Sequence, residues 1–84
     1  MSHVFKSEKE FLSNCSSAYN LKSYAETLSP PNAIIDFVYA YAEANTYIAL
    51  YDILNPNGIP SKRLKVSCTE LPDYTCEYKV IESN

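Results

Sequence analysis

The stretch PNAIIDFVYAYAEANTYIALYDIL, residues 31–54, decides the fold, because two hydrophobic periodicities compete within it. Its first part repeats apolar residues at the three- and four-residue spacing of one helix face. That face would consist of Ile34, Phe37, Val38, Tyr41 and Ala42. Continuing the same helix would bury Asn45 and Asp52, whereas residues 46–54 are rich in the β-branched and aromatic residues typical of strands. The pattern therefore predicts a helix over 31–44 and a strand over 46–54.

Two further helices are predicted before this stretch. Residues 7–10, SEKE, have the form of a capping box, in which the serine hydroxyl accepts a helical N–H and the last glutamate reaches back. Phe5 and Phe11 flank this cap as in a hydrophobic staple. Apolar residues continue at helical spacing until a pair of prolines. We expect helices over 7–17 and 20–28.

The C-terminal part is typical of strands joined by turns. Asn55–Pro60 is a turn signal that contains the single glycine of the chain. Apolar and polar residues then alternate over 64–69 and again over 75–80, which is the period of a half-buried strand. Turns centred near Gly58 and Pro72 would place five cross-strand pairs on one apolar face. These pairs are Leu64–Val80, Val66–Tyr78, Cys68–Cys76, Leu50–Val66 and Ile48–Cys68.

We accordingly expect one small α+β domain over residues 1–84, with two to three N-terminal helices packed on one face of a three-stranded antiparallel meander. An alternative interpretation continues a single long helix over residues 32–54 and keeps only a C-terminal β-hairpin. The composition favours a folded chain in both cases, since 46% of the 84 residues are hydrophobic and eight are tyrosine.

Composition also narrows the environment and the partners. No stretch is apolar enough to span a bilayer, and three cysteines make a poor disulfide framework, so we expect a cytoplasmic protein with no membrane partner. The net charge of −3 disfavours nucleic acid as the partner, because its binders usually carry a basic surplus. Residues 23–61 contain four acidic side chains and no Lys or Arg, which concentrates negative charge there.

Catalytic and metal-binding patterns are absent from the sequence. His3 is the single histidine and lies far along the chain from Cys68 and Cys76, so neither a nucleophile–base pair nor a set of zinc ligands has the usual spacing. One glycine is too few for a phosphate-binding loop. We therefore expect no enzyme activity, no metal and no cofactor. Cys68 and Cys76 are expected to be reduced and buried, with a redox-dependent bridge between them as the alternative.

Tyrosines beside carboxylates suggest a protein-binding face. On the helix predicted over 31–44 the outward residues are Asp36, Tyr39, Glu43 and, beyond its end, Tyr47. Tyrosine supplies rigid amphipathic contact area at small entropic cost, and the carboxylates favour a partner with a basic surface. We expect a small acidic protein that binds another protein and blocks it. By size and charge alone it is comparable to inhibitors, antitoxins and host-takeover factors of phages and mobile elements.

Two alternative functions use the predicted sheet. The outer sheet face would carry Tyr51, Arg63, Lys65 and Lys79. Aromatic and basic residues on an open sheet are used by proteins that stack the bases of single-stranded nucleic acid. The other alternative is a structural subunit that forms a homo-oligomer through exposed Tyr47, Tyr51 and Ile53.

Overall fold

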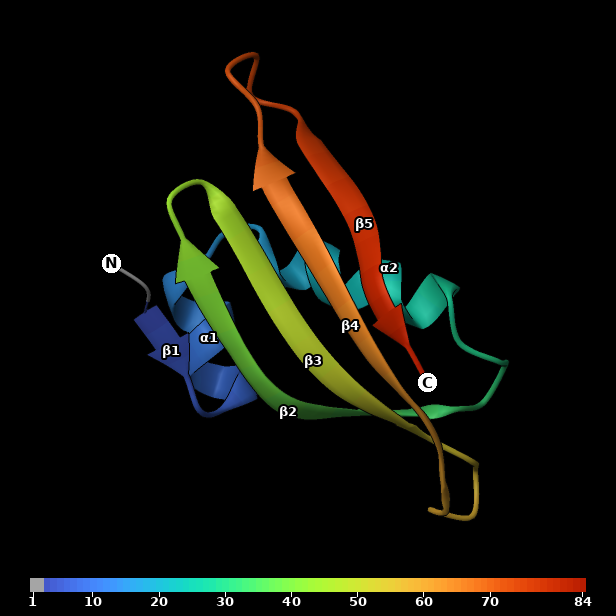
Figure 1. Cartoon of the computed structure of the whole chain (residues 1–84). Helices are drawn as coiled ribbons and strands as arrows, with labels where there is room; N and C mark the ends of the chain where they lie inside the picture. Colours follow the sequence, from blue (N-terminus) through green and yellow to red (C-terminus); the bar gives the residue numbers. More distant parts are fainter. Residues whose placement is uncertain (1–2) are drawn as a thin grey trace.

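A computed structural model describes residues 3–84, which form two α-helices and one five-stranded antiparallel sheet (Figure 1). The elements are β1 (His3–Phe5), α1 (Glu8–Asn14), α2 (Ala18–Thr27), β2 (Ile34–Glu43), β3 (Thr46–Leu54), β4 (Pro60–Glu70) and β5 (Cys76–Ser83). The strands lie in the sheet in the order of the chain. Both helices pack on the same side of the sheet (Figure 1). We call this side the covered face and the other side the open face.

The predicted fold class is wrong, because residues 34–43, within the helix predicted over 31–44, form a strand. Neither the three-stranded meander with two to three helices nor the alternative long helix over 32–54 occurs. β2 contains a bulge between Phe37 and Tyr39, which adds one residue to the strand. That extra residue shifts the two-residue alternation of a strand and imitates the three- and four-residue spacing of a helix. The α+β description is therefore replaced by a mainly β architecture.

The N-terminal helices are confirmed, although each is shorter or shifted relative to its predicted range. The Ser7 hydroxyl accepts a hydrogen bond of 3.1 Å from the backbone N–H of Glu10, as the capping box requires. The rings of Phe5 and Phe11 lie 5.4 Å apart, so the hydrophobic staple also forms. The chain before the cap was not expected to be regular, yet β1 pairs with residues 40–42 of β2. This pairing forms because β2 would otherwise be the edge strand of the sheet, with unpaired backbone groups on its outer side.

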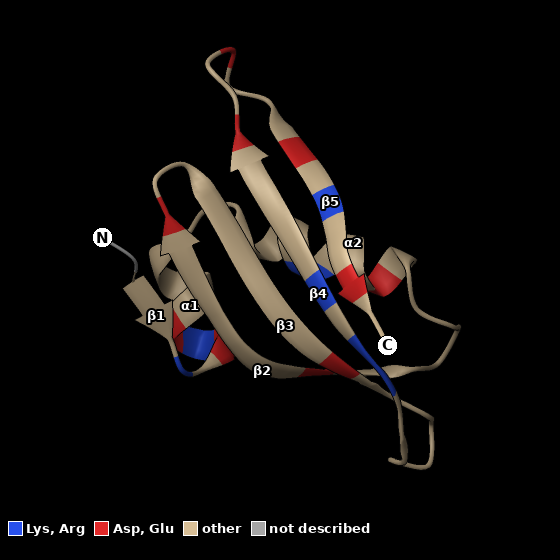
Figure 2. Ribbon diagram, in the orientation of Figure 1, with Lys and Arg blue, Asp and Glu red and all other residues tan. Residues whose placement is uncertain are grey.

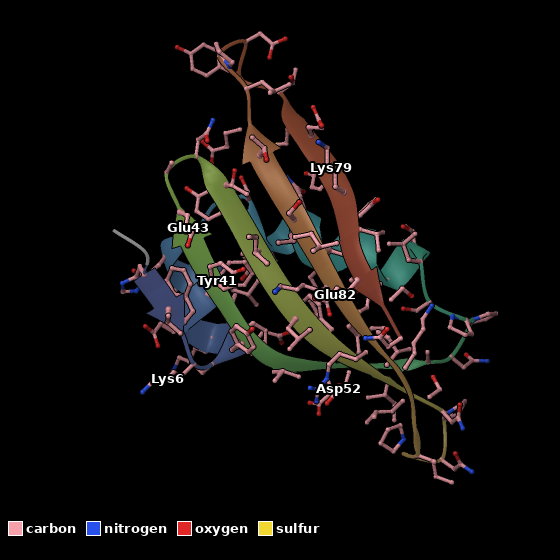
Figure 3. The ribbon with its side chains drawn as sticks, viewed as in Figure 1. Lys6, Tyr41, Glu43, Asp52, Lys79 and Glu82 are labelled. Carbon is pink, nitrogen blue, oxygen red and sulfur yellow. The ribbon has the colours of Figure 1, made fainter. Side chains whose placement is uncertain are left out.

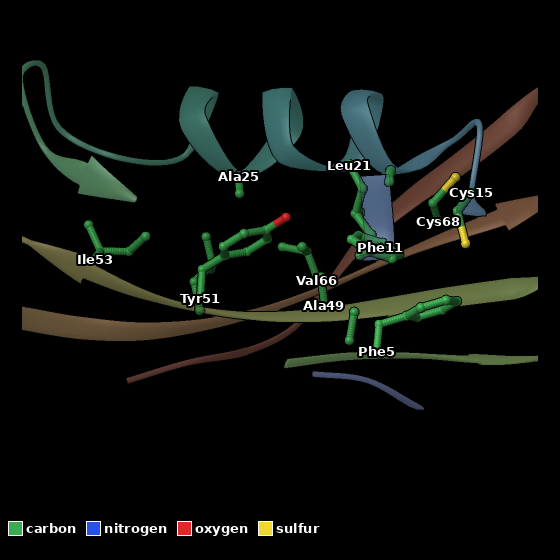
Figure 4. Close-up of a cluster of buried hydrophobic side chains, with 13 residues drawn as sticks. Phe5, Phe11, Cys15, Leu21, Ala25, Ala49, Tyr51, Ile53, Val66 and Cys68 are labelled. Atoms are coloured by element: carbon green, nitrogen blue, oxygen red, sulfur yellow. The ribbon is translucent and has the colours of Figure 1, made fainter. Parts of the chain in front are cut away.

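The core lies between the helices and the covered face, and small residues set its thickness (Figure 4). Ala18 and Ala25 of α2 and Ala40 and Ala49 of the sheet are all completely buried. Their short side chains let the helix layer approach the strands closely. The space between them is filled by larger side chains. The largest fully buried ones are Tyr51, Phe11, Leu21, Ile53, Leu64, Val66 and Cys68.

The register of the hairpins also differs from the prediction. Between β4 and β5, Cys68 is opposite Tyr78 and not Cys76, because the turn is centred on Asp73 and not on Pro72. This shift of two residues keeps the same side chains on the covered face. Between β3 and β4, Ala49 is opposite Val66, where Leu50 was expected. That shift of one residue exchanges the two faces of β3 completely.

Consequently the outward and inward residues of β3 are the reverse of those expected. Tyr47, Tyr51 and Ile53 lie on the covered face, whereas Ile48 and Leu50 lie on the open face. A bulge between Ile53 and Leu54 accounts for the odd-numbered shift. In the part of the chain that the structure describes, neither helix is long and apolar enough to cross a membrane.

Candidate binding surfaces

The open face presents rows of side chains that follow the pairing of the strands (Figure 3). One row, from β2 to β5, consists of Tyr39, Leu50, Lys65 and Glu82. The next row consists of Tyr41, Ile48, Ser67 and Lys79. Aromatic and aliphatic side chains thus occupy β2 and β3, and charged or hydroxyl side chains occupy β4 and β5. No helix of residues 3–84 covers either row.

An aromatic pair lies at the centre of this face. The rings of Tyr39 and Tyr41 are 6.1 Å apart and nearly parallel, at 17°. The ammonium group of Lys65 lies 5.7 Å from the centre of the Tyr41 ring, within cation–π range. Between these long side chains Leu50 is only 7% exposed. Tyr39, Tyr41 and Lys65 therefore form a lid of amphipathic side chains over an apolar floor, and we call these four residues the tyrosine patch.

Charges of opposite sign border the tyrosine patch on different strands (Figure 2). Asp36 and Glu43 lie near the two ends of β2, whereas Arg63 and Lys65 lie on β4. Arg63 donates hydrogen bonds of 2.8 and 3.3 Å to the two carboxylate oxygens of Asp52. The hydrogen bond and the charge of Asp52 raise the pKa of Arg63 above its ordinary value. The negative charge of Asp52 is thereby compensated by Arg63. Asp36, which is opposite Asp52 on the open face, remains as the acidic group at this end of β2.

The structure brings together three of the four residues predicted to bind a protein. Asp36, Tyr39 and Glu43 all lie on the open face of β2, because the bulge keeps Asp36 and Tyr39 on one side. Tyr47 lies on the covered face instead, packed against the core. Burial, followed by the negative charge of Glu70, raises the pKa of the Tyr47 hydroxyl. Tyr41 lies on the open face together with these three residues. The sequence did not identify it, because helical spacing assigned Tyr41 to the buried side.

The residues predicted to bind nucleic acid are likewise divided between the open face and the covered face. Arg63, Lys65 and Lys79 lie on the open face, but Tyr51 is completely buried under α2 and its predicted exposure is wrong. The surface predicted for self-association is also unavailable. Ile53 is completely buried as well, and Tyr47 is partly buried on the same covered face. An aromatic and basic pair does exist on the open face, but it is formed by Tyr41 and Lys65.

A second exposed feature is Tyr74 at the tip of the β4–β5 hairpin, where the sequence predicted a turn but did not indicate an exposed tyrosine. Tyr74 is 98% exposed and has a φ of 67°, in the left-handed region that favours glycine or asparagine. Asp73 accepts hydrogen bonds from the backbone N–H and the hydroxyl of Thr75, at 3.2 and 2.6 Å, and the hydroxyl bond lowers the pKa of Asp73. These bonds hold the turn that projects Tyr74 into solvent. No periodic signal in the sequence marks such a turn position.

Cys15, Cys68 and Cys76 are all free. Burial is the main cause that raises the pKa of Cys68 to about 11 and that of Cys15 above its ordinary value. Raised pKa values leave little thiolate at neutral pH, so Cys15 and Cys68 are poor nucleophiles. Cys68 and Cys76 occupy diagonal and not opposite positions of the ladder, which is unfavourable for a bridge.

A hollow of about 320 Å³ lies beside Cys76, between the start of α2 and the β4–β5 turn. Ser17 at its wall donates a hydrogen bond of 3.3 Å to Glu70 and lies 3.9 Å from the sulfur of Cys76. These contacts satisfy the hydroxyl of Ser17 within the wall of the hollow. Within residues 3–84 no group of three His, Cys, Asp or Glu side chains is placed to hold a metal ion.

Comparisons with protein-family models, with curated proteins and with solved structures find no match for this chain.

Proposed function

We propose that this protein acts without catalysis, by binding another protein through the open face of its sheet. The observation that carries the proposal is the tyrosine patch, an aromatic pair over the apolar floor of Leu50 with the carboxylates of Asp36 and Glu43 along the same strand. Tyrosine is enriched in interfaces because it combines apolar area with a polar tip. A partner that displaces Lys65 from the Tyr41 ring would gain both the ring and Leu50 as contact area.

The partner that fits has a basic surface. The acidic groups Asp36 and Glu43 stand at the ends of the tyrosine patch, and Glu70, Asp73 and Glu77 add negative charge at the end of the sheet where Glu43 lies (Figure 2). The backbone N–H of Glu70 donates to the carbonyl of Asn45 at 2.9 Å, so the two hairpin turns at this end are adjacent. Electrostatic attraction would orient the partner, and the tyrosines would supply the buried contact.

Tyr74 supports the same proposal, because a bulky residue in a left-handed turn carries a conformational cost that its side chain does not recover within residues 3–84. This conformational cost at Tyr74 would be offset if the tyrosine ring enters a pocket of the partner. Covering a basic site in this manner would inhibit the partner. We place this action in the cytoplasm, where the free thiols remain reduced.

The test is affinity capture of the tagged protein from the lysate of its own cells, with and without nuclease, followed by association kinetics with the protein recovered. A single charge reversal on the tyrosine patch border, Glu43→Lys, should slow association roughly tenfold and weaken its dependence on salt. The matched control is Glu26→Lys, which makes the same charge change at an exposed position on α2 in the opposite layer.

Equal slowing in both variants would attribute the effect to net charge and would contradict binding through the open face. Unchanged kinetics for a folded Glu43→Lys variant would contradict the acidic border as the element that guides association. Recovery of no nuclease-resistant protein partner would contradict the proposed function as a whole.

A second candidate function, binding of single-stranded nucleic acid, is favoured by one observation. Lys65 stands over the ring of Tyr41, and Arg63 is on the same strand and face. This function predicts that all captured partners are lost after nuclease treatment. It also predicts that Arg63→Ala and Lys65→Ala each lower affinity for a single strand and flatten its salt dependence, by about one phosphate contact each.

A further inference from the structure

The sheet ends in a long edge that nothing covers. Among residues 3–84, β5 pairs with β4 on one side only, so the backbone groups on its other side are unpaired over eight residues. The opposite edge is shorter, because β1 already pairs with residues 40–42 of β2 and leaves only residues 34–39 of that strand free. Only β5 therefore offers a long edge for another strand. We call it the free edge.

The free edge is also apolar at its centre. Val80 is 43% exposed and Ile81 is 45% exposed, although both lie within β5. Val80 is opposite the completely buried Val66, so it continues the apolar layer of the covered face to the margin of the sheet. A strand added beside β5 would remove these two side chains from water.

A bulge in β5 determines how the charges on the free edge are arranged. Lys79 is opposite Ser67 and Glu82 is opposite Lys65, and these two β4 residues share the open face. Lys79 and Glu82 therefore point to the same side although they are three residues apart, because Ile81 is the extra residue of the bulge. Figure 3 shows both side chains on the open face.

We propose that two copies of this chain associate through their free edges and form one continuous ten-stranded sheet. In an antiparallel pairing about a two-fold axis between Val80 and Ile81, Lys79 faces Glu82 of the partner subunit. The symmetry repeats this ion pair on the other side of the axis. The free edge is thus complementary to itself in charge and in apolar content.

This inference is independent of what binds the open face, but it has a consequence for that binding. Both open faces would lie on the same side of the continuous sheet, so one dimer would present two tyrosine patches to a partner. Two linked binding sites raise the apparent affinity when the partner offers two sites at matching distance.

A lysine on an edge strand has another common use, which is to prevent association. The two roles make opposite predictions for Lys79. If Lys79 protects the edge, its replacement by a neutral residue increases self-association. If Lys79 pairs with Glu82 of the partner subunit, the same replacement decreases it. The variant Lys79→Ala therefore separates the two roles directly.

The experiment measures the mass of the purified protein by sedimentation and light scattering over a wide concentration range, from micromolar to millimolar. We expect a monomer–dimer equilibrium. Lys79→Glu and Glu82→Lys should each weaken the dimer roughly 10- to 30-fold, because each turns two attractive pairs into two repulsive ones. The double variant Lys79→Glu/Glu82→Lys should restore most of the affinity, because it re-creates the pairs in reversed order.

Glu77→Gln is the matched control. It removes the 3.0 Å ion pair within β5 between Glu77 and Lys79 but leaves the proposed pairs intact, so the dimer should persist. Thermal unfolding of each variant establishes that it is folded. A monomer at every concentration, stronger association of Lys79→Ala, or failure of the double variant to recover affinity would overturn the inference. Loss of the dimer in Tyr39→Ser with no effect of the β5 variants would overturn it too, since association would then use the open face.

Discussion

The two faces of the sheet bury their apolar residues in opposite ways. On the covered face, Ala40 and Ala49 are completely buried because two helices pack directly on them (Figure 4). On the open face, Leu50 is almost as well buried, but only tyrosine and lysine side chains of the sheet itself lie over it. The first kind of burial requires folding of the whole chain. The burial of Leu50 on the open face requires only that a few long side chains of the sheet adopt particular rotamers.

This difference indicates where a partner can bind without disturbing the packing of the core. Side chains of the covered face are held by close packing, and none of them can move outward without opening a cavity. The tyrosine patch can rearrange, since Lys65 and the two tyrosines exchange their contacts with each other for contacts with a partner. The open face is therefore the one suited to recognition, and the predictions below test whether the two faces differ as described.

The largest expected effect is the truncation of a leucine on each face. Leu64→Ala removes a fully buried side chain under the helices, and it should lower the free energy of unfolding by about 3 kcal/mol. Leu50→Ala leaves a hollow that the side chains above it, or water, can fill, so the loss should be about 1.5 kcal/mol. Urea unfolding of both variants measures the two values. Equal losses would show that the open face is packed as rigidly as the core.

A smaller effect is expected from removal of one buried hydroxyl. Tyr51 is completely buried with its hydroxyl turned toward the helix layer (Figure 4), and within residues 3–84 that hydroxyl has no hydrogen-bond partner. Tyr51→Phe should raise the free energy of unfolding by about 1 kcal/mol, because the desolvated group is removed and the ring is kept. The control on the open face is Tyr39→Phe, which should leave stability unchanged. A loss of stability in Tyr51→Phe would reveal a bound water at the hydroxyl.

The smallest effect is absent at neutral pH and develops in alkaline solution. Burial raises the pKa of Cys68 from its ordinary 9.0 to about 11 in the folded protein. The stability that this neutral thiol contributes is complete below pH 9 and is lost as the pH rises through 11, because the unfolded chain ionises first. Urea unfolding at several alkaline pH values should show this decline, and Cys68→Ala should make it shallower. An unchanged slope in Cys68→Ala would assign the decline to other groups.

The sequence predicted the N-terminal helices because their signals are local. The Ser7 cap and the Phe5–Phe11 contact need only neighbours along the chain, and both form as expected. The alternation over 64–69 likewise identified β4, since one side of that strand carries apolar residues of the core and the other carries Lys65, Ser67 and Thr69. Local signals of this kind need no knowledge of the rest of the fold.

The prediction for residues 31–44 failed because a bulge and a helix share a spacing. With the extra residue between Phe37 and Tyr39, Asp36 and Tyr39 lie on one face of a strand, as they would on one face of a helix. The predicted set Asp36, Tyr39 and Glu43 was therefore grouped correctly for an incorrect reason. Tyr47 was lost from the group because it is opposite Ala42 and therefore lies on the covered face.

The sequence by itself determined the Ser7 cap of the first helix, the approximate positions of the β3–β4 and β4–β5 turns, the apolar content of each strand and the concentration of acidic residues. It could not determine which residues of β3 face the helices, because a shift of one residue in pairing inverts a strand at no cost to its local pattern. Only the tertiary structure decided that question. Tyr51 is buried and Leu50 is on the open face because the bulge at Ile53 sets the pairing of β3 with β4, and packing against α2 selects that register over its alternatives.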